Sequence, residues 1–219
     1  MNTNKPVIKT YTHIADKYDK KFESYLHATF IKAIAALKLK GGEKILDVAC
    51  GTGGLESALL GKFPGLNITG IDITKPMLKI AHEKCKNPHH VRFLHMPSQK
   101  LTFEDAQFDI VITCSAFHYM RSPEKVLAEC CRVLVPGGRF ILIDWCRDFL
   151  WAKFYHLLSK MYKRSHYKVY TLHEMKRLCA EAYLNITETE TFAIPPFWRM
   201  MCVEAEKEIA SRWSKVFGG

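Results

Sequence analysis

Short apolar runs alternate with helical patterns through the middle of the chain. The strand-like runs are residues 44–48, 67–72, 91–95, 108–114 and 139–146. Helical spacing of apolar residues covers 54–62, 76–84 and 123–134. Pro76 and Pro123 fall in the first turns of the last two, where proline is tolerated. Strands that alternate with helices predict a parallel α/β sheet with helices on both faces and right-handed crossovers.

Helical patterns also occupy the segment before this core. Residues 8–21 place apolar side chains at helical spacing, and residues 25–37 do the same up to the glycine pair at 41–42. The stretch 1–40 is therefore predicted to form an N-terminal helical cap. Because 1–10 is polar and lacks an apolar run, no secretory signal is expected.

The last third of the chain has a different character. Residues 147–168 mix aromatic side chains with Lys and Arg against a single acid, Asp148, which predicts a basic helical insertion after the fifth strand, spanning 147–170. The remaining part, 171–219, is predicted as a helix over 172–182, a strand over 186–193, a turn into 197–203 and a terminal helix over 204–216. All of these elements belong to one predicted domain, 1–219.

Composition narrows the class of protein. The chain has 219 residues, 48% hydrophobic and 25% charged, which are values for a single globular domain without a membrane span. Its eight cysteines form no C-x-x-C pair, so buried reduced thiols in a cytoplasmic protein are expected. The net charge of +10 favours anionic partners such as nucleic acid, an acidic membrane face or a charged metabolite.

A glycine-rich turn, 49–54, follows the first predicted strand. A strand that runs into such a turn and then a helix is typical of a nucleotide site. The nicotinamide fingerprint G-x-G-x-x-G fails, because its third glycine would stand at Glu56. The phosphate-binding P-loop also fails, because Gly61-Lys62 is followed by Phe63 instead of Ser or Thr.

The stretch from Asp47 to Gly53 instead resembles the first motif of class I S-adenosylmethionine (SAM) dependent methyltransferases, with Ala49 in place of the usual first glycine. Asp72 ends the next strand, where a carboxylate can accept the ribose hydroxyls. Later motifs match at 108–111 and 132–138, so the resemblance covers about 40–146, the expected SAM-binding core 41–146. It implies a Rossmann-like, seven-stranded, mostly parallel sheet whose last strand is antiparallel.

The N-terminal sequence 14–19 resembles the helix that precedes the domain in small-molecule members, including the ubiquinone/menaquinone C-methyltransferase-like group with its type 11 domain. In that group tyrosines of this helix close over the cofactor. Pro97 departs from the pattern, since an acid usually contacts the adenine there; Ser98 and Gln99 are the substitutes. The resemblance implies these cofactor-binding residues: Tyr11, Tyr18, Asp47, Ala49, Gly51, Gly53, Asp72, Ile73, Met77, Ser98, Gln99, Cys114 and Ser115.

The acceptor side of the site rests on fewer residues. His118 follows the fourth strand, where it either acts as a general base or contacts the ligands without moving a proton. Tyr119, Trp151 and Tyr155 are candidates for substrate contact. The basic segment 147–168 is either a lid over the acceptor, a contact with anionic membrane, or a solvated helix with an aromatic inner face.

Together these features predict a SAM-dependent methyltransferase that acts on O, N, S or C of a small molecule, either anionic or lipid- or quinone-like. No metal is required, because the sulfonium is already a strong electrophile. RNA methylation is an alternative motivated by the charge, although 113–116 lacks the Asn/Asp-Pro-Pro-aromatic motif, so nucleic acid is not the expected partner. A non-catalytic SAM-binding or partner-binding protein is the other alternative. The oligomeric state is left open.

Overall fold

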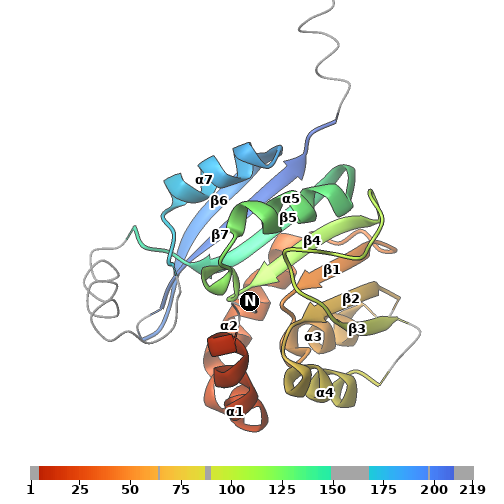
Figure 1. Ribbon diagram of the computed structural model, residues 1–219, viewed down its shortest axis with the longest axis vertical. Helices are drawn as coiled ribbons and strands as arrows, with labels where there is room; N and C mark the ends of the chain where they lie inside the picture. The colour runs from red at the N-terminus through yellow and green to blue at the C-terminus, as the bar shows by residue number, and fades with distance from the viewer. Residues whose placement is uncertain (1–4, 64, 87–89, 149–167, 197, 210–219) are drawn as a thin grey trace, which may run out of the picture.

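Seven strands form one twisted sheet in the computed structural model, which describes residues 5–63, 65–86, 90–148, 168–196 and 198–209 (Figure 1). Its order is β3-β2-β1-β4-β5-β7-β6. β7 runs antiparallel to both of its neighbours, β5 and β6, and the other pairs are parallel. The strands are β1 (Lys44–Val48), β2 (Asn67–Asp72), β3 (Val91–His95), β4 (Phe108–Cys114), β5 (Leu134–Trp145), β6 (Leu184–Ile194) and β7 (Trp198–Lys207).

Helices cover both faces of this sheet. α5 (Pro123–Val133) and α7 (Leu172–Glu181) bury Leu127 and Met175 in one apolar core. α2 (Glu23–Leu37), α3 (Gly54–Lys62) and α4 (Lys75–Lys84) close the second core on the opposite face. Since both faces are covered, as predicted, the inner parallel strands β1 and β4 are buried along most of their length.

Local sequence sets the ends of several helices. The α7 N-terminus has a capping box, in which the Thr171 hydroxyl accepts the backbone N–H of Glu174 and the Glu174 carboxylate accepts the N–H of Thr171. Pro76 and Pro123 stand in the first turns of α4 and α5, as predicted. The N-terminal cap consists of α1 (Lys5–Lys21) and α2, which Phe22 separates with a non-helical conformation.

The fold and most boundaries agree with the prediction. Strands 44–48, 67–72, 91–95 and 108–114 are confirmed residue for residue, and the antiparallel last strand is confirmed by β7. The terminal helix predicted over 204–216 is wrong for its described part, because β7 continues to Lys207. Glu204 pairs with both Ile141 of β5 and Glu188 of β6, so hydrogen bonding on two sides outweighs the helical pattern.

Two other features bear on the predictions. β5 begins at Leu134, five residues before the predicted start at 139, because Leu134 already pairs with Phe108. The candidates Trp151 and Tyr155, with most of the basic segment 147–168, lie outside the described residues. Within the described ranges, no helix is both long and apolar enough to cross a bilayer.

The strand order reverses direction between β1 and β4. The connections that follow these two strands therefore diverge, one toward β2 and one toward β5, and leave a crevice at the carboxyl ends of the strands. The glycine turn follows β1 and the short 3₁₀ helix η1 (Phe117–Tyr119) follows β4, so both motifs are placed at this crevice.

Candidate active site

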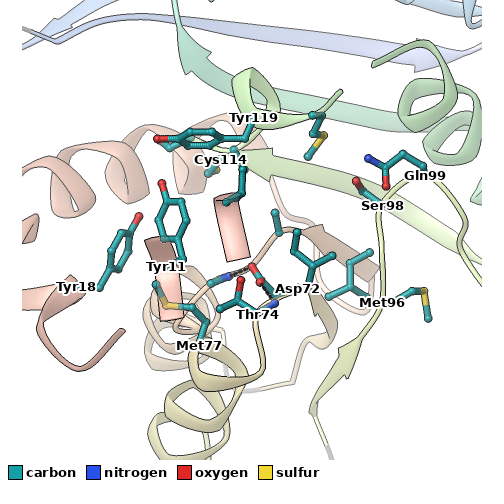
Figure 2. A pocket seen from close by; sticks show the side chains of 18 residues that line it. Tyr11, Tyr18, Asp72, Thr74, Met77, Met96, Ser98, Gln99, Cys114 and Tyr119 are labelled. Carbon is teal, nitrogen blue, oxygen red and sulfur yellow. Dashed lines mark hydrogen bonds between the residues drawn. The ribbon is translucent and has the colours of Figure 1, made fainter. Parts of the chain in front are cut away.

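A cavity opens at the carboxyl ends of β1, β2 and β4, under α1. Figure 2 shows Asp72 near its middle, Tyr11, Tyr18 and Tyr119 toward one end, and Ser98 and Gln99 at the other. Of the predicted cofactor residues, those that line it are Tyr11, Tyr18, Ala49, Gly51, Asp72, Ile73, Met77, Ser98, Gln99, Cys114 and Ser115.

The turn after β1 has left-handed backbone at three alternate residues, Ala49, Gly51 and Gly53, with φ of 67°, 57° and 70°. The N–H groups of Ala49 and Cys50 donate to the carbonyl of Ile71 at 2.8 and 3.0 Å, which fixes the turn against β2. A Cβ added to Gly51 would meet no protein atom within 4 Å. A Cβ on Gly53 would lie 2.9 Å from Cβ of Ala81. Gly51 therefore leaves space for a ligand, whereas Gly53 allows close packing of α4.

Asp72 ends β2 and is 9% exposed. Its Oδ2 accepts the N–H of Gly51 at 3.1 Å, and its Oδ1 accepts the N–H of Thr74 at 2.7 Å (Figure 2). Burial raises the pKa of Asp72, and these two donors offset part of the shift. The carboxyl group is thus fixed beside the glycine turn, at the wall of the cavity.

A second hollow continues from the first along the glycine turn. It shares Tyr18, Ala49 and Gly51 with the cavity, and Asp47 lines its inner end. Asp47 is 3% exposed, and burial raises its pKa to about 7. Gly53 lines neither hollow, because it lies behind the turn against α4. The combined space has a carboxyl group at Asp72 and a second one at Asp47, which suits a ligand with hydroxyl and ammonium groups.

Three tyrosines form one wall of the cavity. The ring of Tyr11 makes edge contacts with those of Tyr18 and Tyr119, at centroid distances of 5.8 and 5.6 Å. Burial raises the pKa of both Tyr11 and Tyr18 well above the ordinary value, so these phenols stay neutral. The wall therefore offers aromatic faces and hydroxyl groups without a charge.

α1 is tied to the glycine turn and to α4 by polar side chains. Thr52, which is 3% exposed, donates its hydroxyl to Oδ1 of Asp19 at 2.6 Å. Lys84 of α4 donates to Oδ2 of the same carboxylate at 2.7 Å. Since Asp19 and Tyr18 are adjacent on α1, this contact holds the tyrosines over the cavity.

His118 lies on η1 but does not line the cavity, whereas its neighbour Tyr119 does. The imidazole is 2% exposed and stacks on Trp145 at 4.1 Å. Its Nδ1 is 2.6 Å from Oδ1 of Asp144, whose Oδ2 accepts the backbone N–H of His118 at 3.0 Å. Asp144 and His118 thus form a buried pair that fixes the turn carrying Tyr119.

Behind this pair, hydrogen bonds lead to the cavity wall. Trp145 donates from Nε1 to the hydroxyl of Tyr25 at 3.0 Å, and that hydroxyl lies 2.6 Å from Oγ of Ser115. Sequence reasoning did not single out Asp144, Tyr25 or Asp19. Asp144 could have been recognised from the sequence, because it is the one acid in the apolar run 140–145. Asp19 and Tyr25 have no such signal, because their partners are distant in sequence.

Comparison with known proteins identifies a family that this chain resembles. A family model described as a methyltransferase domain matches residues 46–142. A ubiquinone/menaquinone biosynthesis C-methyltransferase from Campylobacter jejuni is 31% identical over 172 residues, which cover 68% of this chain and 72% of that protein.

Two further relatives match over less of their own length. A demethylmenaquinone methyltransferase from Thermus thermophilus is 39% identical over 107 residues, covering 48% of this chain and 49% of that protein. A sterol 4-C-methyltransferase from Caenorhabditis elegans is 30% identical over 189 residues, covering 85% and 53%. The chain therefore spans about half the length of these two proteins.

Solved structures show the same fold. In the complex between the Haloferax volcanii Trm112 methyltransferase activator and a methyltransferase, one chain superposes with a TM-score of 0.79 at 18% identity. The match covers 91% of this chain and 98% of that one.

Proposed function

The chain belongs to the class I SAM-dependent methyltransferases, and from this premise we propose that it transfers a methyl group from SAM to a small, predominantly apolar acceptor. The observation that carries the proposal is a pair of adjoining hollows along the glycine turn, which share Tyr18, Ala49 and Gly51. Asp72 lines one of them and Asp47 the other. This space offers one carboxyl group for ribose hydroxyls and another for an ammonium group, and Gly51 keeps a Cβ out of it.

Different residues of the two hollows would contact different parts of the cofactor. Asp72 would hold the ribose, Asp47 the ammonium group of the methionine part, and the loop with Ser98 and Gln99 the adenine. When bound, SAM supplies an electrophilic methyl group on a sulfonium. Tyr11 and Tyr119 then exclude water from the reacting end of the cavity and orient the acceptor.

The lining favours an uncharged acceptor. No Lys, Arg or His belongs to the described lining of either hollow, and the tyrosine end adds Val7, Ala116 and Met120. An apolar ring system fits such a wall better than an anion does. The named activities of the relatives, on demethylmenaquinone and on a sterol, support a lipid- or quinone-like acceptor over a charged metabolite.

For His118 the geometry supports positioning instead of contact with the acceptor. The imidazole is held by Asp144 and stacked on Trp145, and its neighbour Tyr119 is the residue that reaches the cavity. We therefore propose that His118 and Asp144 orient Tyr119.

Calorimetry with S-adenosylhomocysteine (SAH) tests the cofactor site first. Asp72→Asn is expected to weaken binding by roughly tenfold or more, because hydrogen bonds to a charged group are lost. Asp16→Asn is the matched control, since Asp16 is exposed on α1. If the wild type does not bind SAH, the proposal fails.

Methyl transfer is tested separately. The protein is incubated with SAM labelled in its methyl group and with membrane-lipid extracts or demethylated quinones, and the organic phase is counted. Label in an apolar product supports the proposal. Tight SAH binding without transfer to any extract component would instead support a non-catalytic SAM-binding protein.

A further inference from the structure

Beneath the glycine turn lies a third carboxyl group, which lines neither hollow of the cofactor site. Glu56, in the first turn of α3, is fully buried, with 0% exposure. Its side chain projects toward β2, where the position of a Cβ on Gly70 would be only 2.7 Å from Oε1 of Glu56. Gly70 pairs with Asp47 across the two strands. The glycine thus makes the room in which the carboxyl group of Glu56 lies beside that of Asp47.

The two carboxyl groups lie close enough that each shifts the pKa of the other. No other described residue donates a hydrogen bond to Oδ1 of Asp47 or to either oxygen of Glu56. Two carboxylates could not satisfy one another, because each only accepts. A single shared proton turns the same contact into a strong, charge-assisted O–H···O hydrogen bond.

The surroundings do not neutralise a second negative charge. The titratable groups that interact with Glu56 are Asp47 on β1, Cys50 in the turn, Lys84 and Cys85 on α4, and Cys114 on β4, while Asp72 on β2 interacts with Asp47. Lys84 is the one cation among them, and its Nζ is already bonded to Asp19 and Thr52. Burial and the charge of Asp47 raise the pKa of Glu56 well above its ordinary value.

We propose that Glu56 is a positioning residue that stays protonated and donates its O–H to Asp47, so that Asp47 faces the cofactor's ammonium group as a single, oriented carboxylate. This assignment of Glu56 rests on the proposed function, because Asp47 is taken to bind that group. The hydrogen bond from Glu56 lowers the pKa of Asp47, against the larger effect of burial. Glu56 therefore stabilises the charged form that the ammonium group needs.

The first test concerns the protonation state and does not involve the cofactor. The folded protein keeps a proton that the unfolded chain releases above about pH 4.3. The stability of the wild type therefore falls, relative to E56Q, as pH rises from 5 to 7. The ratio of their unfolding constants, measured by urea titration, is expected to change by up to about tenfold per pH unit. A ratio that stays constant over this interval would mean that Glu56 is ionised in the folded protein, and the proposal would be wrong.

The second test concerns the positioning of Asp47, with SAH as the probe in calorimetry at pH 7. E56L, which cannot donate, is expected to bind SAH roughly 10- to 100-fold more weakly, as for loss of a hydrogen bond to a charged group. E56Q, whose amide donates in the same place, is expected to restore the affinity. E56M replaces E56L if the branched side chain prevents folding. If the apolar variant binds like the wild type, Glu56 does not orient Asp47.

The two tests separate this inference from the proposed function. Absence of SAH binding in the wild type would overturn the proposed function, while the stability comparison would still report the proton on Glu56. Conversely, normal SAH binding in the wild type and in E56L would leave the cofactor site intact and remove only the role of Glu56.

Discussion

The three left-handed residues of the glycine turn predict three different results for one added or removed methyl group. Gly51→Ala places a Cβ in open space, so its cost to folding is only the left-handed backbone of an alanine, about 1–2 kcal/mol. Gly53→Ala has the same backbone cost, and its Cβ would also lie 2.9 Å from Ala81 and 3.0 Å from Phe93. Overpacking adds about 1–3 kcal/mol, so roughly 2–5 kcal/mol is expected.

Ala49→Gly is the reverse change, because alanine already adopts a φ of 67° there. The substitution relieves this conformation, but glycine also has more conformational freedom in the unfolded chain. The net gain in the free energy of unfolding is expected to be about 0.5–1 kcal/mol. Urea unfolding followed by circular dichroism measures all three free energies.

SAH calorimetry then separates folding from binding. Gly51→Ala is expected to weaken SAH binding by roughly tenfold or more, because its methyl group occupies ligand space. Gly53→Ala is expected to lower stability with a smaller effect on affinity. If Gly51→Ala bound SAH within twofold of the wild type, the assignment of this turn to the cofactor would be refuted.

Other contacts of the site give further expected outcomes. Asp19→Asn removes the charge that holds Thr52 and Lys84; because the pair is partly exposed, a loss of about 1 kcal/mol is expected in urea unfolding, with weaker SAH binding. Unchanged affinity would contradict a role for this contact in holding α1. Since the pKa of Asp47 is raised to about 7, SAH affinity should fall as pH decreases below 7, with protons released on binding in calorimetry across buffers. An SAH affinity that does not change from pH 6 to 8 would contradict the contact between Asp47 and the ammonium group. Trp145→Phe loses the hydrogen bond to Tyr25 and should cost about 1 kcal/mol, with Trp198→Phe as the comparison.

The sequence predicted the inner parallel strands because they are buried on both faces and their sequences are largely apolar. β7 is harder to predict from the sequence, because Glu204 and Glu206 lie in its second half and give a polar, helix-like pattern. Its conformation is decided by β5 and β6 on its two sides, which a local pattern does not contain.

The geometry of the proposed cofactor side was likewise more predictable than that of the proposed acceptor side. Glycines at alternate positions and an acid at the end of the next strand follow one another along the chain, so a motif records them. The pair of His118 and Asp144 joins β5 to the turn after β4, across 26 positions of sequence. In the sequence, Glu56 serves only to exclude a nicotinamide-binding motif. Its raised pKa follows from burial, which a sequence pattern does not show.

α1 gives the protein a modular architecture. The proposed cofactor site is built from strands and turns of the central sheet, whereas Tyr11 and Tyr18 come from one helix that precedes them, separated from α2 by Phe22 alone. The polar contacts that tie this helix to the glycine turn and to α4 include those of Asp19. Exchange of residues 5–21 for the equivalent helix of a relative is therefore a practical route to a changed acceptor range, since the strands proposed to hold the methyl donor would be left as they are.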